Sequence, residues 1–65
     1  MCLSKIYDSV KNDESLVADE VTGLTNREGR IEIKTLLGAE KILDGYEIGE
    51  VNLMENYVIL KSAGD

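Results

Sequence analysis

The chain has 65 residues, a net charge of -6, and no histidine, phenylalanine or tryptophan. This length allows one small domain over residues 1–65, whose core must be built from isoleucine, leucine and valine. The negative charge repels nucleic-acid phosphates and anionic lipid. The lack of histidine removes an enzyme's usual general base and zinc's usual ligand, so we expect a protein that is not an enzyme.

Apolar and polar residues alternate with a period of two in the first half of the chain, which is typical of strands. The alternation predicts strands over residues 2–7 and 16–21. A polar, acidic connection over residues 8–14 joins them. Residues 22–23 and 25–29 have the composition of turns, because they contain Gly, Asn and Thr between apolar stretches.

The second half contains the clearest alternation of the sequence, over residues 30–37, where Ile31, Ile33, Thr35 and Leu37 share one face. Gly38-Ala39 is a candidate for a tight hairpin. Gly45 and Gly49 predict a bent or bulged segment. Further strands are predicted over residues 40–43, 51–53 and 57–61.

Five or six short, closely spaced strands predict an all-β fold. We expect a small antiparallel β-barrel of the SH3/Sm-like kind, as a single domain. The glycines at positions 38, 45 and 49 would supply the corners that such a barrel needs.

The residue most suited to chemistry is Cys2, the single cysteine of the chain. If Met1 is removed, the amine and thiolate of Cys2 form a chelate. If Met1 stays, its amine, the Cys2 backbone nitrogen and the thiolate are the donors. Mixed nitrogen and sulfur donors in a plane suit nickel(II) or copper(II), and a symmetric dimer that joins two termini would double the donor set. The alternative is that Cys2 is an ordinary small buried residue of the first strand.

Other polar groups have simpler interpretations. The acidic pairs 13–14 and 19–20 lack the spacing of a calcium loop, so we expect a solvated rim. Tyr7, Tyr46 and Tyr57 are not interleaved with basic residues, which favours packing over base stacking.

A single cysteine fits a reducing cytoplasm. No apolar run approaches the roughly 20 residues of a membrane helix, and the start lacks the pattern of a secretory signal.

Several segments, taken together, are similar to one known family. They are MCLSKIY at 1–7, LVADEV at 16–21, IEIKTLLGAEK at 31–41, GYEI at 45–48 and VIL at 58–60. The chain resembles the CooT family of small nickel-binding proteins, accessory to the maturation of carbon monoxide dehydrogenase. The resemblance implies a small β-barrel, a homodimer, and a nickel site on the cysteine after the initiator methionine, which is Cys2 here. Leu37 stands where the family motif usually has phenylalanine, a change that mainly affects packing.

The expected function is therefore that of a cytoplasmic metallochaperone. A homodimer would hold nickel(II) at Cys2 for delivery to a nickel enzyme such as carbon monoxide dehydrogenase, a client implied by the resemblance alone. The alternative is a small β-barrel that binds RNA or a protein segment without metal, because family members are also labelled as RNA-binding. The charge of -6 argues against nucleic acid as a partner.

Overall fold

A computed structural model of the protein describes residues 3–63, which form strands and one short 3-10 helix. The helix η1 comprises Asp13–Ser15. The strands in chain order are β1 (Ser4–Asp8), β2 (Leu16–Arg27), β3 (Arg30–Thr35), β4 (Glu40–Asp44), β5 (Tyr46–Asn52) and β6 (Tyr57–Ser62). The predicted all-β class with five or six strands is confirmed.

All six strands belong to one sheet, in the order β4-β3-β2-β1-β6-β5. Neighbouring strands are antiparallel except β1 and β6, which run parallel with Lys5 opposite Tyr57 and Asp8 opposite Leu60. The prediction of a purely antiparallel arrangement is therefore wrong at this pair. Parallel neighbours need a long crossover connection, and here the four other strands lie between β1 and β6 in the chain.

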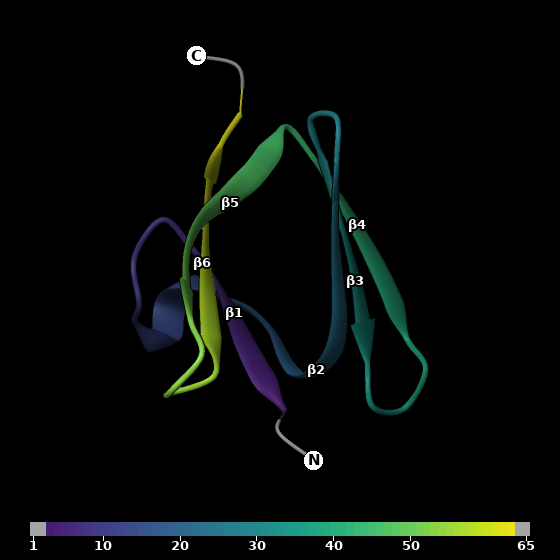
Figure 1. Ribbon diagram of the computed structural model, residues 1–65, viewed down its shortest axis with the longest axis vertical. Helices are drawn as coiled ribbons and strands as arrows, with labels where there is room; N and C mark the ends of the chain where they lie inside the picture. Colours follow the sequence, from purple (N-terminus) through teal and green to yellow (C-terminus); the bar gives the residue numbers. More distant parts are fainter. Residues whose placement is uncertain (1–2, 64–65) are drawn as a thin grey trace.

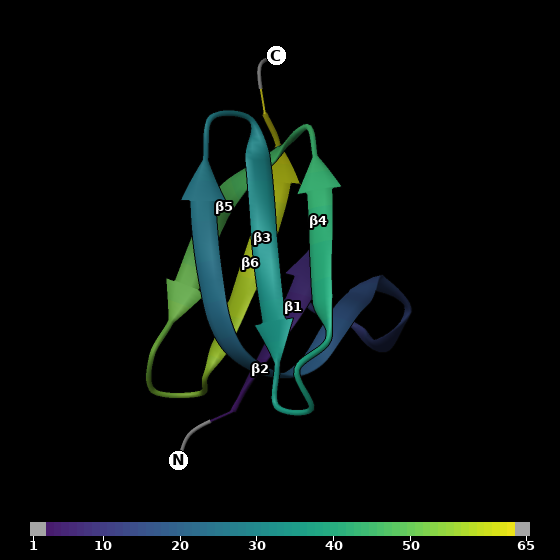
Figure 2. The same ribbon diagram turned by 90° about the vertical axis from the view of Figure 1, so that its right-hand side faces the viewer.

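The sheet folds over on itself into two layers. Strands β2, β3 and β4 form one layer, and β1, β5 and β6 form the other (Figures 1 and 2). Gly45, the residue between β4 and β5, ties the layers at one end. Its N–H donates to Gly29 O at 2.7 Å, and its carbonyl accepts from the N–H of Ala63 at 2.9 Å. In the part of the chain described, the edge strands β4 and β5 are not paired with each other, so the sheet does not close into a barrel there.

The core lies between the layers and is aliphatic, as the composition predicts. Buried side chains from β1, β2, β3 and β6 meet in one cluster, and the residues are Ile6, Val21, Ile31, Ile33, Val58 and Leu60. Ile31 and Ile33 alternate with polar residues along β3, which confirms the inward face predicted for them. Removing these side chains from water supplies most of the free energy that holds so small a fold together.

Strand β2 is longer than the sequence predicts. The predicted turn residues Thr22-Gly23 and Thr25-Asn26 belong to the strand. The pairing with β3 shifts once, at Thr22 between Val21 and Gly23, and then runs to Arg27 opposite Arg30. The turn itself is only residues 28–29, with Gly29 at φ 66°. Pairing in a long hairpin gives backbone N–H and C=O groups hydrogen-bond partners. This gain outweighs the preference of the individual residues for a turn.

The hairpin between β3 and β4 is located as predicted, but its apolar residues are not. Gly38 adopts φ 89°, and its N–H donates to Thr35 O at 3.0 Å, which confirms the tight turn. Strand β3 ends at Thr35, so Leu37 lies in the turn with 90% of its surface exposed instead of facing the core. The alternation of apolar and polar residues continues to Leu37, but β3 ends at Thr35.

The predicted bulge at Gly49 is confirmed, although β5 is one continuous strand that begins at Tyr46. The pairing with β6 shifts between Ile48 and Glu50, so Gly49 is the extra residue. A Cβ atom at Gly49 would lie 3.1 Å from the carbonyl oxygen of Ile59. This close approach of the backbone explains why glycine occupies the position.

Replacing Gly49 with alanine is expected to lower the free energy of unfolding by about 1–2 kcal/mol, because a backbone oxygen of the paired strand must move. Gly23→Ala is the matched control, since a Cβ there meets only Lys34 Cβ at an ordinary 3.7 Å. Urea unfolding measures both variants. Equal effects at the two glycines would contradict the assignment of the bulge as a close backbone contact.

Candidate functional site

Three segments of the chain lie at the same end of the molecule, and one of them is the start of β1. Ser4 is opposite Val21 of β2, and Val21 is opposite Thr35 at the end of β3. On the other side, the N–H of Lys5 donates to Asn56 O, just before β6, at 3.1 Å. The start of β1, the β3–β4 turn and the β5–β6 turn therefore lie at the same end of the molecule, with the two turns on opposite sides, as Figure 1 shows. We call this the proximal end.

The two turns of the proximal end carry the most exposed apolar side chains of the described residues. Leu37 of the β3–β4 turn is 90% exposed. Leu53 and Met54 of the β5–β6 turn are 82% and 92% exposed, and Leu36 is about half exposed. An apolar group of this kind is a usual mark of an interaction surface.

A pocket of about 230 Å³ opens beside the first described residue, Leu3. We call it the tyrosine pocket, and its lining residues are Leu3, Lys5, Tyr7, Lys11, Asp19, Glu55, Asn56 and Tyr57. The Lys5 ammonium lies 3.2 Å from the Asp19 carboxylate. The Lys11 ammonium lies 3.5 Å from Glu55. The pocket thus combines aromatic rings with two ion pairs.

The acidic pairs lie on the surface, as the sequence predicts. Asp13 and Glu14 are exposed in η1. The pKa of the Asp19 carboxyl is lowered, first because the backbone N–H of Glu20 donates to it at 2.7 Å and then because Lys5 lies beside it. The same pair raises the pKa of Lys5. The Asp19 carboxylate therefore serves a local hydrogen bond and an ion pair.

The tyrosines pack, which confirms the prediction made for them. Tyr7 is buried, and its ring meets that of Tyr57 edge-to-face at 6.2 Å between centroids. Tyr46 packs against the core, and its hydroxyl donates to Asp8 at 2.9 Å. That hydrogen bond to the carboxylate is the main reason why the pKa of Tyr46 is raised.

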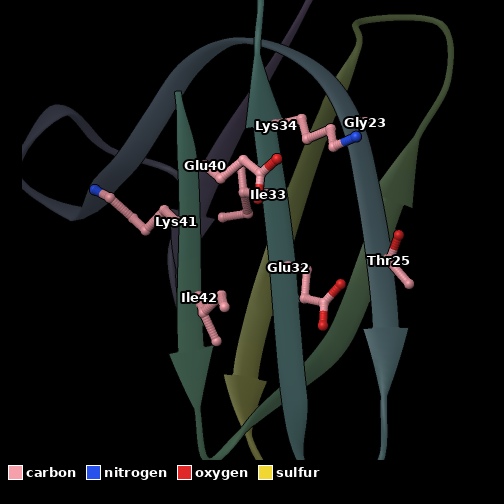
Figure 3. Close-up of a pocket in the computed structure, with 8 residues that line it drawn as sticks. All are labelled: Gly23, Thr25, Glu32, Ile33, Lys34, Glu40, Lys41 and Ile42. Carbon is pink, nitrogen blue, oxygen red and sulfur yellow. The ribbon is translucent and has the colours of Figure 1, made fainter. Parts of the chain in front are cut away.

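A second depression, of about 260 Å³, lies on the outer face of the β2–β3–β4 layer (Figure 3). Its lining residues are Gly23, Thr25, Glu32, Ile33, Lys34, Glu40, Lys41 and Ile42. One carboxylate oxygen of Glu32 is shared by Arg27 at 3.1 Å and Arg30 at 3.0 Å. The Lys41 ammonium donates to Val17 O at 3.0 Å. With these groups already engaged, the depression carries no candidate site.

The comparison with protein families identifies the chain. The pattern of the family described as "CO dehydrogenase accessory protein CooT" matches residues 1–61. The chain belongs to the CooT family. The match confirms the resemblance seen in the sequence, and it makes this chain an accessory protein rather than an enzyme. No curated protein matches the chain.

The CooT match includes Cys2, the predicted metal ligand, but Cys2 lies outside the described residues. Within residues 3–63, no group of three or more His, Cys, Asp or Glu side chains is placed to hold a metal ion. In the same stretch, no helix is both long and apolar enough to span a membrane.

The tyrosine pocket is the feature that sequence reasoning missed. Alternation along β1 does predict Leu3, Lys5 and Tyr7 on one face. Tyr57 joins that face because β6 pairs with β1 in parallel, and Lys11, in the connection after β1, lies over the Tyr57 ring. Local sequence carries no signal for this long-range pairing.

Proposed function

We propose that this CooT protein is a metallochaperone that holds nickel(II) at Cys2 for a nickel enzyme, with carbon monoxide dehydrogenase as the client. The observation that carries the proposal is the family match, which spans residues 1–61 and so includes the Met1-Cys2 start. Calorimetric titration of nickel into wild type and Cys2→Ser tests it. Unchanged binding by the variant would overturn it.

The chemistry of the donors supports nickel as the cargo. A thiolate and main-chain nitrogens of adjacent residues form a planar chelate, the geometry that nickel(II) accepts and tetrahedral zinc does not. Both the thiol and the nitrogen must lose protons on binding, so nickel affinity increases with pH. A site made of few donors near a chain end also exchanges its ion more readily than a closed cage of side chains.

The proposal includes a homodimer in which two copies meet through the proximal end. Leu37, Leu53 and Met54, at least 82% exposed, lie in two turns at the same end of the molecule as the start of β1. Burying them against a second copy would remove apolar surface from water. A two-fold contact at this end would also bring two Cys2 residues toward one another, so that one nickel site could draw donors from both chains.

The double substitution Leu53→Glu with Met54→Glu is expected to convert the dimer to a monomer, because it places four carboxylates in one two-fold contact. Sedimentation equilibrium measures the mass. Val10→Glu is the control, since Val10 is also exposed but follows the far end of β1. A monomeric wild type, or a double variant as dimeric as the control, would contradict the proposed interface.

The remaining parts of the proposal concern the cell and the fold. We take the protein to act in the cytoplasm, where a reducing environment keeps a lone thiol available for metal. We also take residues 1–65 as one small domain, an SH3/Sm-like β-barrel that is open between the edge strands β4 and β5. The tie that Gly45 makes between the two layers supports this proposal. Nucleic acid is not the proposed partner, because the net charge is -6.

A further inference from the structure

The tyrosine pocket has a charge pattern that the proposed nickel site does not use. Two ammonium groups, Lys5 and Lys11, stand at its rim, each beside one carboxylate. All four side chains are about half exposed. Ion pairs this exposed contribute about 0–1 kcal/mol each, so they open at little cost when a ligand offers other partners.

The balance of charges decides which ligand the pocket fits. A simple anion that bound the lysines would leave Asp19 and Glu55 unpaired on a chain whose net charge is already -6. A simple cation would leave the lysines unpaired. A zwitterion leaves no charge of the pocket unpaired. Its carboxylate pairs with a lysine ammonium of the pocket, and its ammonium pairs with a carboxylate of the pocket.

The inner wall of the pocket is aromatic. The rings of Tyr7 and Tyr57 meet edge-to-face, and the Lys11 ammonium lies 4.8 Å from the centre of the Tyr57 ring. Leu3 adds an apolar side chain to the lining, and Asn56 adds an amide. An apolar side chain of the ligand would lie against the rings while its charged groups stay at the rim.

We propose that the tyrosine pocket, of about 230 Å³, binds a free α-amino acid with an apolar side chain. The α-carboxylate would pair with Lys5 or Lys11, the α-ammonium with Asp19 or Glu55, and the side chain would contact the tyrosine rings. This site is distinct from the proposed nickel function and requires no metal.

The test is NMR titration of the metal-free, isotope-labelled protein with three matched probes. They are L-leucine, 4-methylpentanoate, which lacks the amine, and 3-methylbutylamine, which lacks the carboxylate. We expect saturable shifts of the Lys5, Asn56 and Tyr57 amides with L-leucine, and affinities about tenfold weaker for either analogue because each leaves a charge unpaired. Equal affinities for the three probes, or no saturable shift with L-leucine, would overturn the proposal.

Two variants test whether L-leucine binds in the tyrosine pocket. Lys11→Gln is expected to weaken L-leucine binding about tenfold by removing a charged partner. Lys61→Gln is the matched control, because Lys61 is also an exposed lysine beside a glutamate, Glu47, but lies outside the pocket. Equal weakening in both variants would contradict the assignment. Because the titration contains no nickel, absence of L-leucine binding would overturn the amino-acid site and leave the metallochaperone proposal standing. Unchanged nickel binding by Cys2→Ser would overturn the metallochaperone proposal and leave the amino-acid site standing.

Discussion

Replacing Cys2 with serine is expected to abolish nickel binding while leaving the fold intact. The substitution exchanges a thiolate for a hydroxyl that stays protonated at neutral pH and is a poor ligand for nickel(II). Serine differs from cysteine by one atom of the side chain, so we expect the strand content to stay the same. Isothermal titration calorimetry gives the affinity, and circular dichroism checks that the strand content is unchanged.

The control for this experiment is the thioether of Met54, in the β5–β6 turn of the proximal end. Met54→Leu removes a thioether that is 92% exposed while keeping an apolar side chain of similar size. We expect wild-type nickel affinity from this variant, because a thioether is a weaker ligand than a thiolate. If Met54→Leu lost nickel and Cys2→Ser kept it, the donor assignment would be wrong.

Truncating Ile31 to alanine is expected to lower the free energy of unfolding by about 2–5 kcal/mol, the usual cost of a large-to-small change in a well-packed core. Ile31 is fully buried on β3, between the two layers of the folded sheet. A domain of this length has a total stability on the order of 5 kcal/mol. The variant should therefore be largely unfolded at modest urea concentrations, as measured by circular dichroism at fixed protein concentration.

Ile42→Ala is the matched control on the neighbouring strand. Ile42 lies on β4 with 56% of its surface exposed, so its truncation should cost less than about 1 kcal/mol. Comparable losses at the two isoleucines would indicate either that the core does not lie between the layers or that the outer face of β4 is covered.

The sequence predicts the fold class and most strands because alternation is a local signal. It correctly placed Ile31 and Ile33 in the core and the tight turn at Gly38. It failed where non-local pairing overrides local composition. Thr22-Gly23 has the composition of a turn, yet it lies within β2, because β3 pairs with Val21 and Gly23 on either side of a bulge at Thr22. Leu37 continues the alternation of β3 but lies beyond the last pair, in the turn.

The site was predicted unevenly, for a related reason. Cys2 can be proposed from the sequence because its chemistry belongs to one residue and its nearest backbone atoms, and the nickel site there stays a prediction. The tyrosine pocket was not found, because Lys5 and Tyr57 become neighbours only through the parallel pairing of β1 with β6. The apolar surface around Leu53 and Met54 was also missed, since exposure in a turn cannot be read from the residue type.

X-ray absorption at the nickel edge reports which atoms bind the ion, so it tests whether the Cys2 thiolate is a nickel ligand. Nickel-loaded wild type is measured next to nickel-loaded Met54→Leu. We expect sulfur together with nitrogen in the first coordination shell of both samples. A shell of only oxygen and nitrogen in the wild type, with no sulfur, would contradict the claim that the Cys2 thiolate holds the metal.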